Sequence, residues 1–414
     1  MTLRRLAAGW VFPAVAPPIK DGAVLVDAEG HVVAIGSDVG GDVPTPPGTT
    51  TEYFADAAIL PGLVNAHTHL ELTGLGTAID EPDFPSWIRR LRALKSGRTP
   101  EQFLEAARRG VRECWAAGVT TIADTGDTGA VARALAELGG RGVAYHEVFG
   151  PHPEQVAESL AGLKGAIAEL RSLEQPGRLR IGVSPHAPYT VSGPLYREVG
   201  RYAREEKLPL AVHLAESAGE TSLLRDASGG FAEAWRGRDL PEPAPLGLSP
   251  VAYVDHHLGL SETLCIHAVR VDAPDIDLLA RRGASVAHCP LSNRAHRHGD
   301  APLKAMLDAR IPVGVGTDSV LSVGTLDLLA EARAARALAG LNARDTLGLV
   351  TWCAAGAIGF SNRIGMLVAG APADIAVMAM PRDAVEPEEA VLSGRGAVLA
   401  TFVQGREVYR KPQG

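Results

Sequence analysis

Short β-rich runs alternate with helix-like segments through the middle of the chain. Each run ends in polar residues, and the segments between runs carry apolar residues at three- and four-residue intervals and end at glycine. This alternation is typical of parallel βα units whose helices cover the outside of the sheet. Eight such runs occur, at residues 62–69, 118–126, 142–150, 179–187, 208–216, 263–269, 284–290 and 312–319. Eight strands close a barrel, so we predict an α/β fold of the (β/α)₈ TIM-barrel type.

The two ends of the chain resemble each other and differ from the middle. Residues 22–36 form two β-rich runs around a turn, and residues 374–380 and 397–410 are similar to them. We therefore predict a small β-sandwich built from both termini. The predicted division places its N-terminal part at residues 1–57, the barrel at residues 58–369 and its C-terminal part at residues 370–414.

One segment interrupts the alternation of strands and helices. Residues 229–259 are too long and too rich in proline for a plain connection between a strand and the next helix. The segment follows the fifth predicted strand, and long loops of this kind are often functional. A lid over the barrel mouth and simple padding of the surface agree equally well with the sequence.

Composition and charge narrow the class of protein. Hydrophobic residues make up 46% of the 414 residues and charged residues 21%, which is ample for a large core and argues against disorder. The net charge of −8 is spread without a basic block, so we expect neither nucleic acid nor a membrane as partner. The expected partner is a small-molecule substrate, and a homodimer is left open.

Cysteine usage and the start of the chain bear on its location. The four cysteines lie far apart without a C-x-x-C pair, which predicts neither a disulfide framework nor a thiolate zinc site. The first residues imitate a secretory signal, but Pro13 interrupts an apolar stretch that is already short. We predict a first strand there and a cytoplasmic protein.

Histidines gather where the predicted barrel strands end. In a barrel of this type the active site lies at the carboxyl ends of the strands, because the βα loops meet there. A single histidine is usually a packed or surface residue, but six at equivalent positions point to one site. They are His67 and His69 on the first strand, His186 on the fourth, His213 on the fifth, His267 on the sixth and His288 on the seventh, and Asp318 closes the eighth.

The histidine spacing on the first strand predicts a metal site. His67 and His69 stand two apart, so both imidazoles point to the same face of the strand. With His213 and Asp318 they would offer three nitrogens and one carboxylate, the donor set of a catalytic Zn²⁺ or Fe²⁺. No lysine ends a predicted strand, which argues against a carbamate-bridged pair of ions. We expect one divalent metal ion, zinc in the first place and iron as the alternative.

Two further residues are candidates for catalysis. Glu216 lies three residues beyond His213, close to the metal without being needed as a ligand, and could move protons between water and substrate. The alternative is a surface glutamate that begins the next helix. His267 ends a very hydrophobic strand, where it would orient water or stabilise an oxyanion unless it only packs. His288 is doubtful, and we expect the remaining histidines to be structural or surface residues: His31, His146, His152, His256, His257, His296 and His298.

These segments resemble the amidohydrolase superfamily over nearly the whole chain. The resemblance is carried, in the superfamily's order, by PGLVNAHTHLE, SPHAPYTVS, HLAES, IHAV, HCPLSN and VGTDS. The chain is most similar to the mononuclear aminohydrolases related to cytosine, chlorotriazine and methylthioadenosine deaminases. Position by position, the resemblance implies the metal ligands His67, His69, His213 and Asp318, with Glu216 as proton shuttle. It also implies that His267 and Asp318 surround the attacking water.

Finer features bear on the substrate. HTHLELTGL and HLAESAGETSLLRDASGGFAEAW look most similar to aminodeoxyfutalosine deaminases of menaquinone biosynthesis, which hydrolyse the adenine amino group of a nucleoside with a benzoate-like tail. The resemblance implies that His186 binds the purine ring. The ribose-binding glutamate of methylthioadenosine deaminases has no clear match; Glu71 is the candidate, unless it braces the loop. Arg89, Arg90 and Arg92 could meet a carboxylate, although arginines on a helix usually face solvent.

Other functions stay open at this point. The enzyme could deaminate another adenine nucleoside, such as methylthioadenosine or S-adenosylhomocysteine, or guanine or cytosine. A chlorohydrolase or a cyclic amidohydrolase would use the same metal and differ only in its pocket. A non-catalytic binding protein would be expected to lack a metal ligand, and none of the four is missing.

Overall fold

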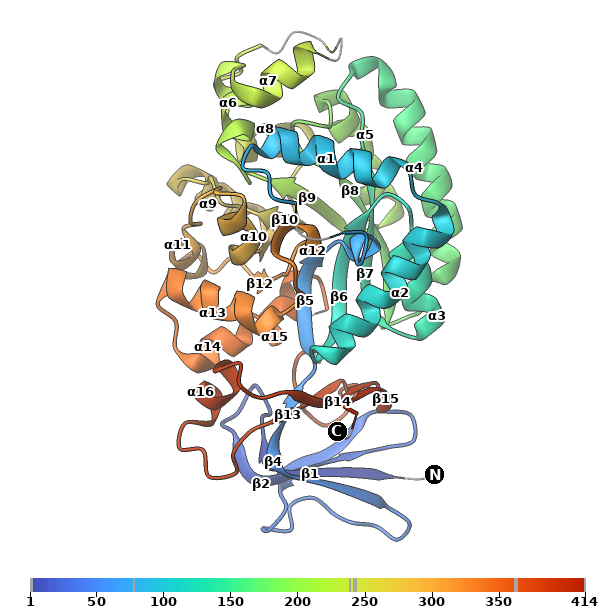
Figure 1. Ribbon diagram of the computed structural model, residues 1–414, viewed down its shortest axis with the longest axis vertical. Helices are drawn as coiled ribbons and strands as arrows, with labels where there is room; N and C mark the ends of the chain where they lie inside the picture. Colours follow the sequence, from blue (N-terminus) through green and yellow to red (C-terminus); the bar gives the residue numbers. More distant parts are fainter. Residues whose placement is uncertain (1–2, 77–78, 238–239, 241–243, 361–363, 413–414) are drawn as a thin grey trace.

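The computed structural model describes residues 3–76, 79–237, 240, 244–360 and 364–412. Eight parallel strands form one sheet that curls into a barrel, in the order of the chain from first to last (Figure 1). The strands are β5 (Leu63–Thr68), β6 (Val119–Gly126), β7 (Arg141–Val148), β8 (Leu179–Pro185), β9 (Leu210–Leu214), β10 (Thr263–His267), β11 (Ser285–His288) and β12 (Val313–Val315). Each coincides with one of the eight predicted runs, so the predicted fold is confirmed.

Hydrogen bonds between the first and last strands close the barrel. The amide of Asp318 donates to the carbonyl of His67 at 3.0 Å, and Thr68 and Asp318 form a parallel bridge. Beneath them the Asn65 side chain donates to the hydroxyl of Thr317 at 2.8 Å and accepts from its amide at 3.1 Å. The seam of the barrel is therefore built from residues next to the predicted metal ligands.

A second sheet combines the two ends of the chain, as predicted. Its seven strands run in the order β15-β14-β13-β4-β1-β2-β3 and lie below the barrel in Figure 1. They are β1 (Arg4–Val11), β2 (Ile19–Val26), β3 (Val32–Ser37), β4 (Thr50–Pro61), β13 (Ile375–Ala379), β14 (Val398–Val403) and β15 (Arg406–Arg410). The strand expected where the chain begins is β1.

The long strand β4 joins the two parts of the molecule. Ala57 and Ile59 belong to the core of the terminal sheet, whereas Ala58 and Leu60, on the other face, belong to the large core that surrounds the barrel. Only Gly62 separates β4 from β5, the first barrel strand. Because β4 runs through residues 57 and 58, the domain boundary proposed there cuts a strand, and the predicted boundaries stay a prediction.

Most of the helices surround the barrel and pack on the outer face of its strands, while a few lie at its carboxyl-terminal end. They are α1 (Phe84–Ser96), α2 (Pro100–Ala116), α3 (Ala130–Leu138), α4 (Val156–Leu170), α5 (Gly193–Glu206), α6 (Ala218–Asp226), α7 (Gly229–Arg236), α8 (Pro250–His257), α9 (Ala273–Arg282), α10 (Pro290–Ala295), α11 (Leu303–Asp308), α12 (Val320–Val323), α13 (Leu328–Ala339), α14 (Ala343–Gly348), α15 (Trp352–Ala357) and α16 (Pro387–Leu392). Short 3₁₀ turns are η1 (Leu70–Leu72), η2 (Pro153–Gln155) and η3 (Arg171–Leu173). Within the described residues, none of the helices is long and apolar enough to cross a membrane.

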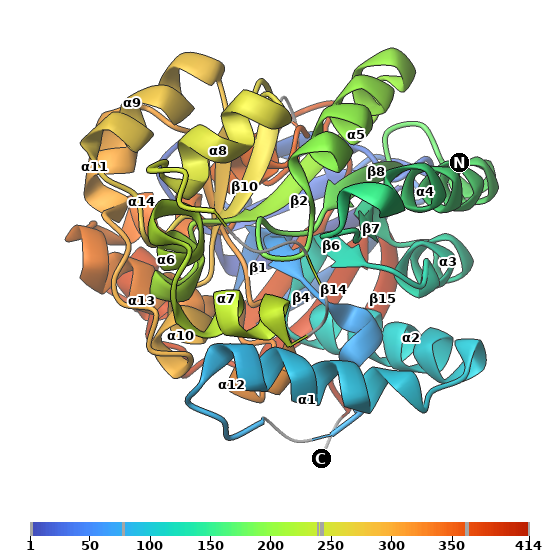
Figure 2. The ribbon, with the colours of Figure 1, turned by 90° about the horizontal axis from the view of Figure 1, so that it is seen from above.

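Two helices lie at the end of the barrel where the strands finish. Figures 1 and 2 place α1 across this end with α7 beside it. The Phe231 ring of α7 stacks on Tyr189 with centroids 4.1 Å apart and meets Phe84 of α1 at 6.2 Å. Within the interrupting segment 229–259, α7 thus borders the mouth while α8 packs between α5 and α9 on the outside. Residues 238, 239 and 241–243 of that segment lie outside the described residues.

A buried ion pair ties the barrel to the terminal sheet. Arg141 begins β7, and its Nε lies 2.6 Å from a carboxylate oxygen of Asp374, with side chains only 2% and 3% exposed. The second oxygen of Asp374 accepts from the amide of Gln404 at 2.7 Å, and its carbonyl accepts from Gly62 at 2.8 Å. The carboxylate of Asp374 therefore links the start of β7 to Gln404 of the terminal sheet, and its backbone carbonyl binds Gly62 between β4 and β5.

Replacing Asp374 with alanine should destabilise the protein strongly, because it leaves the Arg141 guanidinium buried without a counter-charge. We expect the free energy of unfolding, measured by urea denaturation, to fall by about 3–5 kcal/mol. The exposed pair of Arg201 and Glu198 is the control, and R201A should cost less than about 1 kcal/mol. An equally small loss for D374A would contradict a structural role for the buried pair.

Candidate active site

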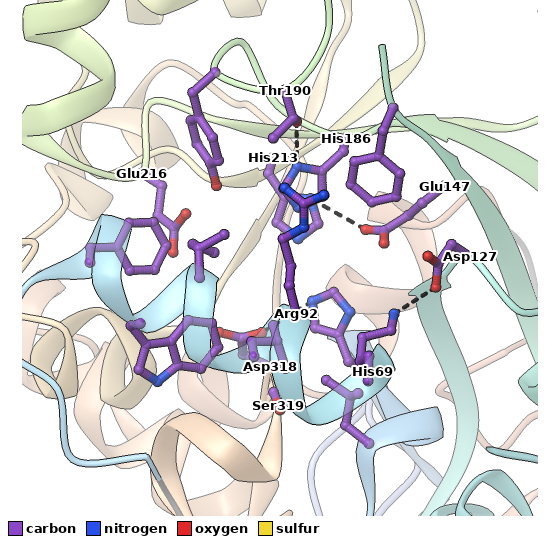
Figure 3. A pocket seen from close by; sticks show the side chains of 18 of the residues that line it. His69, Arg92, Asp127, Glu147, His186, Thr190, His213, Glu216, Asp318 and Ser319 are labelled. Atoms are coloured by element: carbon purple, nitrogen blue, oxygen red, sulfur yellow. Dashed lines mark hydrogen bonds and ion pairs between the residues drawn. The ribbon is translucent and has the colours of Figure 1, made fainter. Parts of the chain in front are cut away.

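A cavity of about 460 Å³ opens at the carboxyl ends of the barrel strands, under α1. Its wall toward the barrel is polar, and its wall toward α1 is largely apolar (Figure 3). The polar lining residues include His69, Glu147, His186, His213, Glu216, His267, His296 and Asp318. The strand-end histidines predicted to converge are thus brought to one cavity, apart from His67 and His288, which lie buried beside it.

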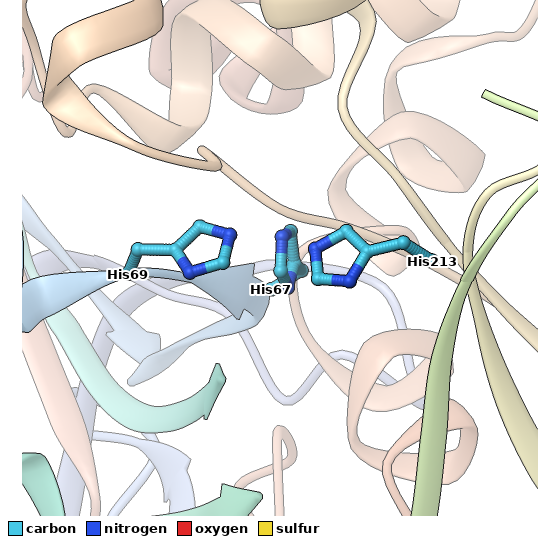
Figure 4. Close-up of side chains that lie close together, drawn as sticks. All are labelled: His67, His69 and His213. Carbon is cyan, nitrogen blue, oxygen red and sulfur yellow. The ribbon is translucent and has the colours of Figure 1, made fainter. Parts of the chain in front are cut away.

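Three imidazoles and one carboxylate converge at the floor of the cavity. Figure 4 shows the rings of His69 and His213 on either side of His67. Ligand atoms of these three histidines lie within 4.8 Å of one another. Oδ1 of Asp318 lies 3.4 Å from Nε2 of both His67 and His69. The four predicted ligands therefore come together from β5, β9 and the end of β12.

Hydrogen bonds and burial prepare these imidazoles to act as ligands. Nδ1 of His69 lies 2.8 Å from the carbonyl of Thr125, which can only accept, so Nδ1 carries the proton and Nε2 keeps its lone pair. Burial lowers the pKa of His69 to about 3 and holds that of His213 well below its ordinary value. Neutral imidazole is the form that binds a metal.

Asp318 is held by its backbone as well as by its side chain. Its φ of 55° lies in the left-handed region, which a non-glycine residue adopts only when its surroundings enforce it. The hydroxyl of Ser292 donates to its Oδ2, which leaves Oδ1 facing His67 and His69. Although burial opposes ionisation, the polar contact with His67 and the electrostatic influence of His267 and His69 keep the pKa of Asp318 well below its usual range.

The residues present fit a divalent metal ion. Nε2 of His67 is buried, with no hydrogen-bond partner in the part of the chain that the structure describes. A buried nitrogen left in this state costs free energy unless a ligand satisfies it. Three imidazoles and one carboxylate with an open side toward the cavity match a catalytic zinc site better than a closed structural one.

Glu216 lies above this site and is held in place from two sides. Its Oε1 lies 3.5 Å from Nε2 of His267 and 3.3 Å from Nε2 of His298. Below it, the carboxylate of Glu220 accepts the amides of Ala215 and Glu216, each at 2.9 Å. Burial, with the nearby charge of Asp318, raises the pKa of Glu216 to about 8. A carboxyl poised near neutral pH is suited to both accept and donate a proton.

The two predicted substrate residues differ in their surroundings. His186 lines the cavity, its ring centroid 4.7 Å from that of His213, and its Nδ1 bonds the hydroxyl of Thr190 at 2.8 Å. Glu71 is 1% exposed and does not appear among the cavity-lining residues. It accepts from Lys95 at 2.7 Å and from the hydroxyl of Thr128. Of the two roles considered for Glu71, these contacts match bracing of the loop.

Several residues at the site were not expected there from the sequence. His296 and His298 are 7% and 4% exposed; His296 lines the cavity, and His298 lies 3.3 Å from Glu216. Glu147 lines the cavity at the end of β7, and its Oε1 lies 3.8 Å from Nδ1 of His213. The position of Glu147 at the end of a predicted strand was the feature of the sequence that could have identified it as a site residue. His296 and His298 follow the seventh strand within a short helix and its turn, which no strand-end pattern identifies.

Comparison with known proteins agrees with this geometry. The family model described as "Amidohydrolase family" matches residues 58–408, most of the chain. The chain belongs to the amidohydrolase family. The predicted resemblance is thereby confirmed, and the chain is an enzyme that hydrolyses carbon–nitrogen bonds. The roles of individual site residues within this amidohydrolase stay predictions.

Several relatives of this amidohydrolase are deaminases. A 5-methylthioadenosine/S-adenosylhomocysteine deaminase of Natronomonas pharaonis is 30% identical, covering 94% of this chain and 86% of its own. An aminodeoxyfutalosine deaminase of Deinococcus radiodurans is 34% identical, covering 69% of this chain and 70% of its own. A crystal structure of an adenosine deaminase from Xanthomonas campestris with bound zinc superposes with a TM-score of 0.83 at 26% identity, covering 98% of this chain and 92% of that one.

Replacing Glu220 with glutamine should slow the reaction without removing metal. The amide group would present N–H to one of the two backbone N–H groups that Glu220 now accepts, so the loop carrying Glu216 would shift. Loss of one buried hydrogen bond costs about 1–3 kcal/mol, which corresponds to a roughly 10- to 100-fold lower kcat. The measurement is kcat together with metal content by atomic emission. The exposed Glu233 offers a matched control, and an E220Q enzyme as fast as E233Q would contradict the positioning role.

Proposed function

We propose that this amidohydrolase is a metal-dependent deaminase that removes the amino group from the adenine ring of a nucleoside. The observation that carries the proposal is the placement of Glu216. It lines the cavity 3.5 Å from His267, whose ligand atom lies within 4.8 Å of those of His67 and Asp318, and it is not needed as a ligand. Replacement of an amino group requires protons to be delivered to the ring and to ammonia, and a carboxyl beside the metal ligands can supply them. Amide hydrolysis would need the same proton transfer, so the choice of an adenine ring is supported by the deaminase relatives.

In this proposal His67, His69, His213 and Asp318 hold one divalent ion, zinc in the first place. When bound, such an ion supplies Lewis acidity that lowers the pKa of water toward about 7. Glu216 accepts a proton from water and delivers it to a ring nitrogen, which makes the amino-bearing carbon electrophilic. The oxygen of that water bonds to this carbon, and the second proton of the water passes to the amino group, so that the carbon–nitrogen bond breaks and ammonia leaves. His267, 3.5 Å from Glu216, orients the same water, and His186 donates or accepts at the purine ring.

Within this class, we propose 6-aminodeoxyfutalosine as the substrate and menaquinone biosynthesis as the pathway, in a cytoplasmic enzyme. The Deinococcus radiodurans relative supports this choice by having the higher identity, 34% against 30%. The Natronomonas pharaonis relative favours a second candidate, methylthioadenosine or S-adenosylhomocysteine, because its match covers 94% of this chain against 69%. The two candidates share the adenine chemistry and differ in the group attached to the ribose.

A substrate panel tests the proposal. Ammonia release and the absorbance change from adenine to hypoxanthine should be measured on zinc-loaded protein with aminodeoxyfutalosine, methylthioadenosine, S-adenosylhomocysteine, adenosine, guanine and cytosine. We expect the highest kcat/KM for aminodeoxyfutalosine. Fastest turnover of methylthioadenosine would select the second candidate. Absence of ammonia from all six would refute the deaminase proposal while leaving a hydrolase of another carbon–nitrogen bond.

Replacing Glu216 with glutamine should stop turnover while metal stays bound, because the amide cannot accept the proton. We expect kcat to fall by about 10²–10⁴-fold, the usual contribution of acid–base catalysis. His69→Ala is the matched comparison, since it should lower metal content and activity together. An E216Q enzyme that keeps full activity would refute the shuttle role, and loss of metal from E216Q would make Glu216 a ligand instead.

A further inference from the structure

The face of α1 that covers the cavity contains two cations, Arg92 and Lys95, among apolar side chains. Phe84, Trp87, Ile88 and Leu91 recur at helical spacing and line the cavity. Arg92 continues this row, four residues after Ile88, and also lines the cavity. Figure 3 shows its side chain extending from α1 toward the polar wall. An apolar helix face normally excludes a guanidinium, so the placement of Arg92 calls for an explanation.

The other cations of α1 already have partners. Lys95 binds Glu71 at 2.7 Å and Asp127 at 2.6 Å, which fastens the end of the helix to the loop after β6. Arg89 donates to the hydroxyl of Ser86 at 2.7 Å, and Arg90 pairs with Glu81 at 3.0 Å. Arg89 and Arg90 do not line the cavity.

Arg92 differs from these three residues because it has no partner among the residues that the structure describes. It makes no hydrogen bond or ion pair with any other residue in the described ranges 3–76, 79–237, 240, 244–360 and 364–412. Its guanidinium is exposed at the mouth of a cavity, with its donors free. A guanidinium that lines a cavity in this state is available to a ligand.

We propose that Arg92 binds a carboxylate on the part of the substrate farthest from the adenine ring. This inference rests on the proposed function, which places the adenine at the barrel floor beside Glu216. The rest of the substrate then lies between the floor and α1, where it meets an apolar surface that carries one guanidinium. The favoured substituent is therefore apolar along its length and ends in an anion, which the planar guanidinium binds through two parallel hydrogen bonds.

The surrounding charge favours a carboxylate over a phosphate. Lys95, the other cation of α1 that lines the cavity, is already paired with Glu71 at 2.7 Å and with Asp127 at 2.6 Å. A phosphate monoester carries close to two negative charges at neutral pH and would need a second unpaired cation, whereas a carboxylate carries one charge. Arg92 alone balances a single charge.

The test compares an acid with its neutral ester. Aminodeoxyfutalosine and its methyl ester keep the same adenine, ribose and aromatic group and differ only in the carboxylate. The variant Arg92→Met removes the charge but keeps an unbranched apolar side chain on the face of α1. Arg89→Met is the matched control on the outer face of the same helix, and Arg92→Lys keeps the charge without the planar fork.

We expect R92M to lower kcat/KM for the acid about 10- to 100-fold, mainly through KM, because a hydrogen-bonded charge pair is lost. The same variant should leave kcat/KM for the ester and for methylthioadenosine unchanged. R92K should fall between R92M and the parent enzyme, and R89M should match the parent. Equal losses of R92M on acid and ester, or no loss on either, would overturn the proposal.

Two further results separate this inference from the proposed function. Calorimetric binding of the acid and the ester to zinc-loaded parent and R92M reports on Arg92 even where no ammonia is released. If the parent binds the acid roughly tenfold more tightly than the ester and R92M does not, the role of Arg92 is supported even where the deaminase proposal fails. Equal binding of acid and ester to the parent would overturn the inference. Adenosine 5′-monophosphate completes the panel, since an Arg92-dependent preference for it over the acid would overturn the assignment to a carboxylate.

Discussion

The site depends on one constraint, the burial of several hydrogen-bonding nitrogens and one ionised carboxylate in a small volume. Burial keeps His69 and His213 neutral, and a carbonyl fixes which nitrogen of His69 carries its proton. Among the described residues, Nε2 of His67 is buried without a hydrogen-bond partner. Such an arrangement is costly by itself and becomes favourable only with a bound cation. This need for a cation explains the surrounding hydrogen bonds, because each of them holds a ligand side chain in place despite the cost of burying it.

Most of the barrel could be predicted from the sequence because its strands are short, buried and evenly spaced. Because the carboxyl ends of all eight strands meet at one end of the barrel, polar residues at these ends can be placed near one another from the sequence alone. This reasoning predicts the positions of His67, His186, His213 and Asp318. The same logic would have included Glu147, which closes β7. The joint sheet of the two termini was predictable from their similar β-rich patterns.

Other parts of the site depend on tertiary contacts that no local pattern encodes. His298 reaches Glu216 from a turn after α10, and Glu220 binds the backbone under Glu216 from inside α6. The role of α1 depends on where this inserted helix lies. The periodicity of its sequence does not show whether Arg92 or Arg89 faces inward, because the surface that its apolar residues cover is known only from the tertiary structure. The contacts of Lys95 with Glu71 and Asp127 supply that orientation.

The seam between β5 and β12 has a consequence for how the molecule is made. His67 and Asp318 are separated by 250 residues, yet their backbones are hydrogen-bonded to each other. The histidine pair therefore leaves the ribosome long before the carboxylate that completes its site, and the terminal sheet also waits for the last strands. Contacts so distant in sequence slow folding. The complete set of proposed metal ligands is thus present only after residue 318 has been synthesised, and shorter nascent chains lack the closing carboxylate.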